Sequence, residues 1–483
     1  MQRSTKIVAT LGPASSETGV LTRMIQAGVD VVRLNFSHGT HDDHRRRVEL
    51  VRDCVRHVGR TVGIMVDLQG PKIRVGKFAE GKVELANGAP FILDAACTLG
   101  DATRVGLDYP ELVDDVTPGA VLLLDDGRLV LDVEAIQGRE IHCRVRVGGT
   151  LSNNKGINRQ GGGLSAPALT DKDKDDIRLA AEFNADYVAV SFPKSGADIR
   201  QARELLAAAG SNAQIIAKIE RTEAIGALEE ILEASDAIMV ARGDLAVEVG
   251  DAAVPALQKR MIRVAREHNK VAITATQMME SMISSPVPTR AEVSDVANAV
   301  LDGTDAVMLS AETAAGKYPV ETIEAMARIC VEAEKSEEIT LDKHFLDRVF
   351  TRIDQSIAMA ALFAAFHLKV KAIASLTQSG STALWMSRIN SGVPIYALTP
   401  EIRSRYRMSL YRNVFPLMMR YIGHDREAAL REAEEELIRA GAVVPGDTIV
   451  LTIGEPIGTP GGTNTMKIVR VGEHNYSTGR SSL

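Results

Sequence analysis

The sequence predicts an α/β protein built around a closed barrel of eight parallel strands, the (βα)8 or TIM barrel. Apolar strand-like runs alternate with helical patterns in residues 1–70 and again from residue 171 to about 340, which is typical of parallel βα units. Together the two stretches hold roughly 240 residues, close to the usual size of about 250. A doubly wound sheet is the alternative, but it needs a Gly-rich dinucleotide turn that the sequence lacks.

The barrel strands can be placed one by one. Residues 1–70 contain the runs KIVATLG, VDVVRLNF and VGIMVDLQ, separated by two helical patterns, the first from roughly Ser16 to Gly28. Five more runs follow from residue 171, namely DYVAVSF, IIAKIE, AIMVARGDL, VAITATQ and AVMLSAET. Three early and five later strands give the eight that close a barrel, which we assign to residues 1–70 and 169–345.

Residues 71–168 interrupt the barrel with short alternating runs such as KVELANG and EIHCRVRVGG. The pairs Asn87-Gly88 and Asp126-Gly127 lie between such runs and predict hairpin turns. We interpret this stretch as a small inserted β-barrel domain. Its exit is rich in Gly, Asn and Ser, the composition of a hinge, so we expect the inserted domain to be a mobile lid.

A third domain is predicted over residues 346–483. From Ile353 onward an Ala-rich helix leads into the strands AIASLT, PIYALT and TIVLTIG. The segment DREAALREAEEELIRAG predicts a solvated amphipathic helix. This order of elements indicates an open-sheet α/β domain.

The composition excludes several classes of protein. A hydrophobic content of 45% excludes a disordered chain. Lys and Arg number 56 against 63 Asp and Glu, and the net charge of -7 argues against a general nucleic-acid binder. The four cysteines form no C-x-x-C pair, no signal-peptide pattern opens the sequence, and no apolar run reaches about 18 residues. We expect a cytoplasmic protein with neither a nucleic-acid nor a membrane partner.

The stretch from Ile215 to Leu245 carries the most informative charges. Lys218 and Glu220 are two residues apart on one strand, so their side chains point to the same face. Asp244 ends the next run, and parallel strands joined by a helix bring its carboxylate alongside Glu220. An ammonium beside two carboxylates indicates a divalent cation with an adjacent anionic substrate. A structural ion-pair network is the alternative.

The ends of the other strands support a site, because a βα barrel carries its active site at the carboxyl ends of its strands. Polar residues follow seven consecutive predicted strands: Arg33, Asn35, Ser37 and His38; Asp67; Ser191; Lys218 and Glu220; Arg242, Gly243 and Asp244; Thr276 and Gln277; and Ser310 and Glu312. Two carboxylates suit Mg²⁺ or Mn²⁺, and two cationic side chains suit a phosphate or an enolate. Phosphoryl transfer fits this set, because it depends mainly on positioning and charge neutralisation.

Eight motifs carry a family resemblance over nearly the full length of the chain: KIVATLGPAS, VVRLNFSHG, VDLQGPKIR, IIAKIE, VARGDLAVE, TATQMMESM, PTRAE and MLSAETAAGKYP. In these motifs the sequence resembles the bacterial pyruvate kinases. The resemblance implies Mg²⁺-dependent transfer of the phosphoryl group of phosphoenolpyruvate to ADP, which yields pyruvate and ATP in the last step of glycolysis. It also implies a homotetramer.

The resemblance assigns roles to single residues. The residues that match contacts to phosphoenolpyruvate are Arg33, Lys218, Gly243, Asp244 and Thr276. Glu220 and Asp244 would hold the metal. Lys218 would stabilise the pyruvate enolate, and Thr276 would help deliver the proton that ketonises it. The positions that match contacts to the nucleotide phosphates are Arg74 and Lys155.

One departure from the family concerns a monovalent cation. Many pyruvate kinases hold K⁺ with residues that match Asn35, Ser37, Asp67 and the carbonyl of Leu68, and have a glutamate where this sequence has Lys72. An ammonium at this position can take the charge role of K⁺. The sequence therefore resembles the potassium-independent branch, and we expect K⁺ not to be required. The alternative is that Lys72 only solvates a hinge and K⁺ still binds beside it.

In the last domain, the segment TQSGST follows a strand and opens a helix, where hydroxyls and backbone amides suit a phosphate. The later loop GEPIGTPGGTNT is flexible enough to close over such a ligand. By resemblance this is an allosteric site, where Thr377, Ser379, Ser381 and Thr382 would hold the phosphoryl group of a sugar phosphate or a nucleotide monophosphate. A capped helix beside a Gly-rich turn is the alternative.

Two other functions stay open. A metal-dependent lyase or aldolase acting on pyruvate enolate would share Lys218, Glu220 and Asp244, but it would need neither the inserted domain nor Arg74. A metabolite-binding regulatory protein on a degenerate barrel would be expected to have lost at least one charged strand end, and none is lost. Formation of pyruvate that depends on ADP separates the two enzyme hypotheses.

Overall fold

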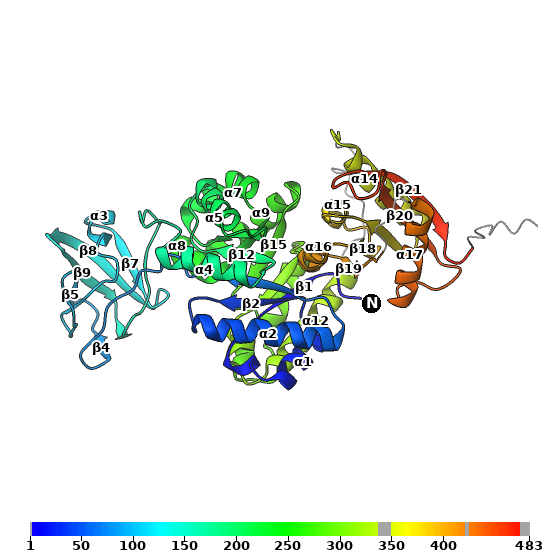
Figure 1. The fold of residues 1–483 in the computed structure, drawn as a ribbon. Coiled ribbons are helices and arrows are strands. Elements are labelled where there is room, and N and C mark those ends of the chain that lie inside the picture. Colours follow the sequence, from blue (N-terminus) through cyan, green and yellow to red (C-terminus); the bar gives the residue numbers. More distant parts are fainter. Residues whose placement is uncertain (1, 337–348, 421–424, 474–483) are drawn as a thin grey trace, which may run out of the picture. The chain divides into compact units, whose positions relative to one another are not determined.

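The computed structural model describes residues 2–336, 349–420 and 425–473 (Figure 1). The chain divides into two compact units, one of Met1–Leu34, Asp42–Met65 and Met278–Leu483, and one of Asn35–His41 and Val66–Gln277. The predicted domain boundary between residues 345 and 346 lies outside the described residues. In the part of the chain that the structure describes, no helix is both long and apolar enough to cross a bilayer.

Eight strands form a closed barrel in the order β1-β16-β15-β14-β13-β12-β3-β2. They are β1 (Lys6–Thr10), β2 (Val31–Asn35), β3 (Gly63–Asp67), β12 (Tyr187–Val190), β13 (Gln214–Ile219), β14 (Ala237–Ala241), β15 (Val271–Ala275) and β16 (Ala306–Leu309). Their side chains are almost all buried, because parallel strands in such a barrel are covered on both faces. The barrel predicted from the sequence is confirmed.

Helices follow the barrel strands. They are α1 (Thr18–Ala27), α2 (His41–Val58), α4 (Asp171–Glu182), α5 (Gly196–Ala208), α6 (Thr222–Gly226), α7 (Leu228–Ala234), α8 (Arg242–Val249), α9 (Val254–Glu267), α10 (Arg290–Leu301), α11 (Ala311–Ala314) and α12 (Pro319–Ser336). Gly28 ends α1 with a φ of 127°, and its amide donates to the carbonyls of Met24 and Ile25. The glycine thus has the helix-ending role that the sequence predicts.

One predicted strand was too long. The run AIMVARGDL was expected to be extended throughout, but β14 ends at Ala241 and α8 begins at Arg242. Asp244 therefore lies in the first turn of a helix rather than at the end of a strand. A carboxylate in that turn interacts favourably with the positive end of the helix dipole, whereas a buried strand offers it no such partner.

The stretch between β3 and α4 is an all-β region with one short helix. Its elements are β4 (Lys82–Leu85), β5 (Pro90–Asp94), β6 (Arg104–Val105), α3 (Leu112–Asp115), β7 (Val121–Leu124), β8 (Leu129–Gln137), β9 (Glu140–Val147), β10 (Gly149–Ser152) and β11 (Ile157–Arg159). The turn at Asp126-Gly127 joins the antiparallel pair β7 and β8, as predicted. Asn87-Gly88 is not a hairpin, because β4 pairs with β10 while β5 pairs with β9.

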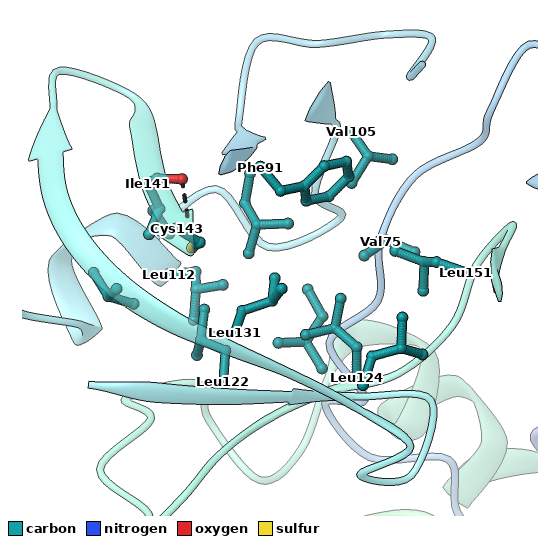
Figure 2. Close-up of a cluster of buried hydrophobic side chains, with 14 of the residues drawn as sticks. Val75, Phe91, Val105, Leu112, Leu122, Leu124, Leu131, Ile141, Cys143 and Leu151 are labelled. Atoms are coloured by element: carbon teal, nitrogen blue, oxygen red, sulfur yellow. Dashed lines mark hydrogen bonds between the residues drawn. The ribbon is translucent and has the colours of Figure 1, made fainter. Parts of the chain in front are cut away.

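The inserted region has a hydrophobic core of its own (Figure 2). Phe91, Leu112, Leu131 and Ile141 are fully buried in it, each with an exposed fraction of 0%. Cys143 lies in the same core and donates from its thiol to the carbonyl of Ile141. Burial raises the pKa of this thiol to about 12, so Cys143 is a packing residue rather than a nucleophile.

The C-terminal region is an open five-stranded sheet in the order β19-β18-β17-β20-β21. Its elements are α14 (Ile353–Leu368), β17 (Ala372–Leu376), α15 (Ser381–Ser387), β18 (Ile395–Thr399), α16 (Ile402–Arg407), β19 (Val414–Met418), α17 (Arg426–Arg439), β20 (Thr448–Gly454) and β21 (Thr463–Arg470). The amphipathic helix predicted from DREAALREAEEELIRAG is α17, capped by Asp425 and packed through Leu430 and Leu437.

A buried ion pair joins this sheet region to the barrel strand β16. Arg388, at the end of α15, pairs with Asp305, which immediately precedes β16, and each side chain is only 1% exposed. One guanidinium nitrogen donates to Asp305 Oδ2 at 3.0 Å, and the backbone N–H of Arg412 donates to Oδ1 at 3.1 Å. Removal of one partner would leave a buried charge without its counter-ion.

Replacing Arg388 tests how much this ion pair contributes to the free energy of unfolding. We expect Arg388→Met to lower the free energy of unfolding by about 3–5 kcal/mol, because Asp305 would remain buried and uncompensated. The control is Arg178→Met, which breaks an exposed pair with Asp175 on α4 and should leave stability nearly unchanged. Urea unfolding followed by circular dichroism compares the two variants, and equal stability losses would contradict the prediction.

Candidate active site

Lys218 is the centre of a buried charged cluster at the end of β13. Its ammonium lies 2.9 Å from Glu220 Oε1 and 3.3 Å from Asp67 Oδ1, and the side chain is only 11% exposed. It also donates to the hydroxyl of Ser191 at 2.7 Å. That hydroxyl in turn donates to the carbonyl of Leu68 at 2.7 Å. The prediction that Lys218 and Glu220 share one face of the strand therefore matches the geometry.

Glu220 is enclosed more completely than Lys218. Its Oε2 accepts a 2.9 Å hydrogen bond from the backbone N–H of Phe192, and the residue is only 1% exposed. Burial raises the pKa of this carboxyl to about 7, and the negative charges of Asp244 and Asp67 act in the same direction. The ammonium of Lys218 opposes the rise. The site thus holds more negative than positive charge.

These residues fit a divalent cation. Glu220 and Asp244 are hard oxygen donors, which Mg²⁺ prefers, and their mutual repulsion would be relieved by a cation between them. Among the described residues no group of three or more His, Cys, Asp or Glu side chains is placed to hold a metal. A metal here would therefore have two carboxylate ligands and positions left for water and substrate oxygens.

Thr276 and Gly243 lie next to each other after β15 and β14. The hydroxyl of Thr276 accepts from the backbone N–H of Gly243 at 2.8 Å and donates to the carbonyl of Ala275 at 2.6 Å. Thr276 has a φ of 71°, which is rare for a β-branched residue and is found at functional sites. Arg242 supports this turn by donating to the carbonyl of Thr276 at 2.7 Å.

A cavity of about 590 Å³ adjoins these residues. Its lining comes from the barrel, the inserted region and the hinge between them, and comprises Lys72, Leu123, Asp126, Gly127, Gln160, Gly243, Asp244, Ala246, Val247, Gly250, Asp251 and Gln277. A Cβ on Gly243 would make only ordinary contacts with Thr276, so packing does not require a glycine there. A glycine at this position would instead allow a ligand to approach the backbone closely.

Arg33 lies within β2, in the other unit. Its guanidinium donates to the hydroxyl of Thr10 at 3.0 Å, and the side chain is mostly buried. Glu312, also at a predicted strand end, has its carboxylate occupied by the backbone N–H groups of Ser310 and Met279. Glu312 therefore stabilises a turn of the chain.

The four residues predicted for a monovalent cation lie in one unit and are already engaged. Asn35 accepts from the backbone N–H of Ser37 at 3.1 Å. Asp67 pairs with Lys218, and the carbonyl of Leu68 accepts from Ser191. Lys72 lines the cavity, and within the described residues its ammonium has no hydrogen-bond or ion-pair partner.

The two predicted nucleotide contacts belong to neighbouring segments of the inserted region. Arg74 forms a bridge with Gly156, and the carbonyl of Lys155 accepts from the backbone N–H of Val75 at 2.9 Å. The ammonium of Lys155 lies 2.7 Å from Asp125, in the turn after β7. The backbone thus brings Arg74 and Lys155 together, while Asp125 holds the lysine.

The TQSGST segment adjoins a second cavity, of about 460 Å³. Thr377 and Thr382 line it, together with Ile457, Gly458 and Thr459 of the loop predicted to close over a ligand. Ser379 and Ser381 lie in the same turn, joined by a 3.2 Å hydrogen bond between their hydroxyls. The two predicted parts of an effector site therefore meet at one cavity.

Comparisons with known proteins decide the family. The family model described as "Pyruvate kinase, barrel domain" matches residues 2–323, and "Pyruvate kinase, alpha/beta domain" matches residues 355–469. The chain belongs to the pyruvate kinase family. It is 54% identical to "Pyruvate kinase II" of Salmonella typhimurium over 475 residues, with 97% of this chain and 99% of the relative covered.

Other pyruvate kinases are similar over a comparable length. The pyruvate kinase of Haemophilus influenzae is 53% identical over 460 residues, covering 94% of this chain and 96% of the relative. The crystal structure of a pyruvate kinase from Cryptosporidium parvum superposes with a TM-score of 0.92 at 34% identity, covering 97% of this chain and 96% of that one. The reaction is therefore transfer of the phosphoryl group of phosphoenolpyruvate to ADP, a kinase reaction of glycolysis.

Two participants in this charged cluster received too little weight from the sequence. Ser191 was noted only as a polar strand end, but its hydroxyl bridges Lys218 and the carbonyl of Leu68. The backbone N–H of Phe192 was not considered, and it binds Glu220. Phe192 has a φ of 54°, a conformation for which the letters SFPK give no signal.

The central lysine provides the test of this cluster. We expect Lys218→Met to lower kcat by about 10²–10³-fold or more, because the site loses its ammonium for a developing enolate, while divalent metal binding is retained. Glu220→Gln is the matched variant, in which metal binding should weaken. Pyruvate formation and Mn²⁺ binding by electron paramagnetic resonance report the two effects, and unchanged turnover in Lys218→Met would refute its role.

Proposed function

We propose that phosphoenolpyruvate binds at the cluster around Lys218, with its phosphate assigned to Arg33 and Lys218 and its contacts completed by Gly243, Asp244 and Thr276. The observation that carries this proposal is the buried ammonium between Glu220 and Asp67, beside a cavity lined by Gly243 and Asp244. Arg33 is assigned on its motif alone. The nucleotide is assigned to the same cavity, with Arg74 and Lys155 on its phosphates.

The transfer step uses these residues for charge and position. The bond between phosphorus and the enol oxygen breaks, a bond from phosphorus to a terminal phosphate oxygen of ADP forms, and ATP and pyruvate enolate result. The ammonium of Lys218 stabilises the enolate oxygen. A proton then adds to the methylene carbon with the help of Thr276, which gives pyruvate. An inserted domain that closes as a lid would exclude water during this step.

Glu220 and Asp244 would hold the divalent metal. Pyruvate kinases generally use Mg²⁺ and K⁺, and two carboxylates with open positions suit Mg²⁺ or Mn²⁺. When bound, such an ion supplies positive charge for the oxygens of the transferred phosphoryl group and of the enolate. A coupled assay for pyruvate with and without ADP and Mg²⁺ tests this function, and pyruvate formation without ADP would favour a lyase instead.

For the monovalent cation, we infer that Lys72 replaces the charge of K⁺. The support is that its ammonium lines the same cavity as Asp244 and has no partner of its own among the described residues. Of the residues that would bind K⁺, Asn35 is hydrogen-bonded to Ser37, Asp67 pairs with Lys218, and the carbonyl of Leu68 accepts from Ser191. The competing hypothesis is that K⁺ still binds beside Lys72.

The dependence on K⁺ separates these hypotheses. In buffer free of Na⁺ and K⁺, with tetramethylammonium holding the ionic strength, we expect activity to be close to that with K⁺. Lys72→Glu should become dependent on K⁺, because a carboxylate would replace the ammonium and create a cation site. A stimulation of the unmodified enzyme by K⁺ of about tenfold or more would contradict the proposal.

We also propose that the cavity beside the TQSGST segment binds a phosphorylated allosteric effector, with Thr377, Ser379, Ser381 and Thr382 around the phosphoryl group. The support is that this turn and the Gly-rich loop line one cavity. Hydroxyls and backbone amides in a turn are suitable donors to phosphate. A sugar phosphate is the first candidate, and a nucleotide monophosphate is the second. A homotetramer in the cytoplasm completes the proposal.

A serine at this turn can be removed without touching the barrel. We expect Ser381→Ala to keep its basal turnover and to lose at least about tenfold in affinity for the effector, because one donor hydroxyl to the phosphoryl group is lost. Ser356→Ala, exposed on α14, is the control. Turnover measured against the concentration of pentose phosphates, hexose phosphates and nucleoside monophosphates reports the change in affinity, and an unchanged response would exclude Ser381 from the site.

A further inference from the structure

The inserted region rejoins the barrel through three consecutive glycines, Gly161, Gly162 and Gly163. Their φ angles are 82°, 78° and 91°, in the left-handed region that only glycine enters at little cost. A Cβ on Gly162 would lie 2.8 Å from the carboxylate oxygens of Glu223. The backbone conformation therefore favours a glycine, and a larger residue would also displace the carboxylate of Glu223. We call residues 161–165 the exit hinge.

Glu223, in α6, holds the exit hinge directly. Its Oε1 accepts a 2.5 Å hydrogen bond from the backbone N–H of Gly163. Its Oε2 is buried and has no hydrogen-bond partner among the residues that the structure describes. A buried carboxylate oxygen without a partner lowers the stability of a fold. Stability alone therefore does not account for a glutamate at this position.

Two cationic side chains donate hydrogen bonds to the backbone in the next part of the exit hinge. Lys194, before α5, donates to the carbonyl of Ser165 at 3.0 Å and to that of Leu164 at 3.4 Å. Arg221, before α6, donates to the carbonyl of Leu164 at 3.4 Å. Three side chains from two barrel segments thus fix a short piece of chain whose own sequence is flexible.

Glu248, in α8, completes the arrangement. Its carbonyl accepts from the backbone N–H of Gly161 at 3.1 Å, and its carboxylate accepts from the backbone N–H of Thr222 at 2.9 Å. Burial raises the pKa of this carboxyl to about 7, the hydrogen bond from Thr222 opposes the rise, and the negative charge of Glu223 adds to it. The exit hinge, α6 and α8 therefore meet around two neighbouring carboxyl groups.

The exit hinge is connected to the cavity by a short ladder of strands. Gln160 immediately precedes it and follows β11, which pairs with β7. The turn after β7 carries Asp126 and Gly127. These two residues and Gln160 line the cavity together with Gly243 and Asp244. A change in the angle of the exit hinge therefore moves one wall of the cavity relative to the other.

We propose that Glu223 is a positioning residue for phosphoryl transfer: by holding Gly163, it sets the angle of the inserted region and so the shape of the cavity assigned to the nucleotide. The inference rests on the proposed nucleotide site. Glu223 does not touch the reacting atoms in this scheme. Its loss would affect the use of ADP more than the use of phosphoenolpyruvate, because the cluster around Lys218 contains no residue of the inserted region.

The test compares three full-length variants under steady-state conditions. Glu223→Ala should raise the KM for ADP and lower kcat/KM for ADP by about tenfold or more, with a much smaller change in the KM for phosphoenolpyruvate. Glu223→Gln keeps an oxygen acceptor for Gly163 and should restore most of the loss. Glu229→Ala removes an exposed glutamate from α7 and should behave like the unmodified enzyme.

Hydrogen exchange supplies a second measurement. The amides of the exit hinge should exchange faster in Glu223→Ala than in Glu223→Gln, because only the alanine variant loses the acceptor for Gly163. Glu223→Asp keeps the charge but shortens the side chain, so its carboxylate moves away from Gly163; it should reproduce the loss in use of ADP and tests the proposal if Glu223→Ala does not fold.

Two outcomes would overturn the proposal. One is a lower melting temperature of Glu223→Ala with unchanged use of ADP, which would indicate a purely structural role. The other is an equal loss in Glu223→Gln and Glu223→Ala, which would mean that the charge matters rather than the hydrogen-bond acceptor. Failure of the proposed nucleotide site would give a different result: replacing Arg74 and Lys155 by alanine would leave the KM for ADP unchanged.

Discussion

The structure of the active site depends on one buried ammonium placed between carboxylates. Lys218 carries one positive charge, and Asp67, Glu220 and Asp244 carry three negative charges, so the cluster has a formal excess of two negative charges. Burying such an excess is costly unless a counter-charge is supplied. A single divalent cation has the charge that balances it. Burial is the main cause that raises the pKa of Glu220 to about 7, and the negative charges of Asp244 and Asp67 act in the same direction.

Much of the fold follows from periodicity, and so does part of this cluster. Counting apolar runs was enough to predict eight strands, and alternation along IIAKIE placed Lys218 and Glu220 on one face. Alternation could not predict the pairing with Asp67, because β12 lies between β13 and β3 in the barrel. That contact depends on side chains from alternate strands meeting inside the barrel, and Ser191 fills the space between them.

Two predictions about secondary structure were wrong, one on the length of a strand and one on a hairpin, and both have local physical causes. The run AIMVARGDL is apolar enough to resemble one long strand, but the strand ends where its side chains would no longer be buried, and α8 starts there. Asn87-Gly88 has the letters of a hairpin, yet the strands that it joins find other partners. A turn sequence specifies only the reversal of the chain. Which strand pairs with which is decided by burial across the whole inserted region.

The sequence could not predict the contact of Glu223 with the exit hinge, for a related reason. In the pattern TEAIGALEEIL, Glu223 has the same helical setting as Glu229 and Glu230, which are exposed. Only the left-handed path of Gly161–Gly163 brings a backbone N–H to that carboxylate. The Gly-rich composition predicted a hinge, but a hinge sequence carries no information about the side chain that holds it.

The hydrogen bonds of Thr276 refine the role that we propose for it in the reaction. Its hydroxyl proton is directed at the carbonyl of Ala275, and one lone pair is used by the N–H of Gly243. A hydroxyl has one donor and two acceptor positions, so what is left is a single acceptor position. Under the proposed mechanism, Thr276 in this arrangement would bind and orient a donor such as a water molecule, and that donor would supply the proton to the enolate carbon. The φ of 71° is unusual for a β-branched residue, and the two hydrogen bonds of the hydroxyl hold Thr276 in this conformation.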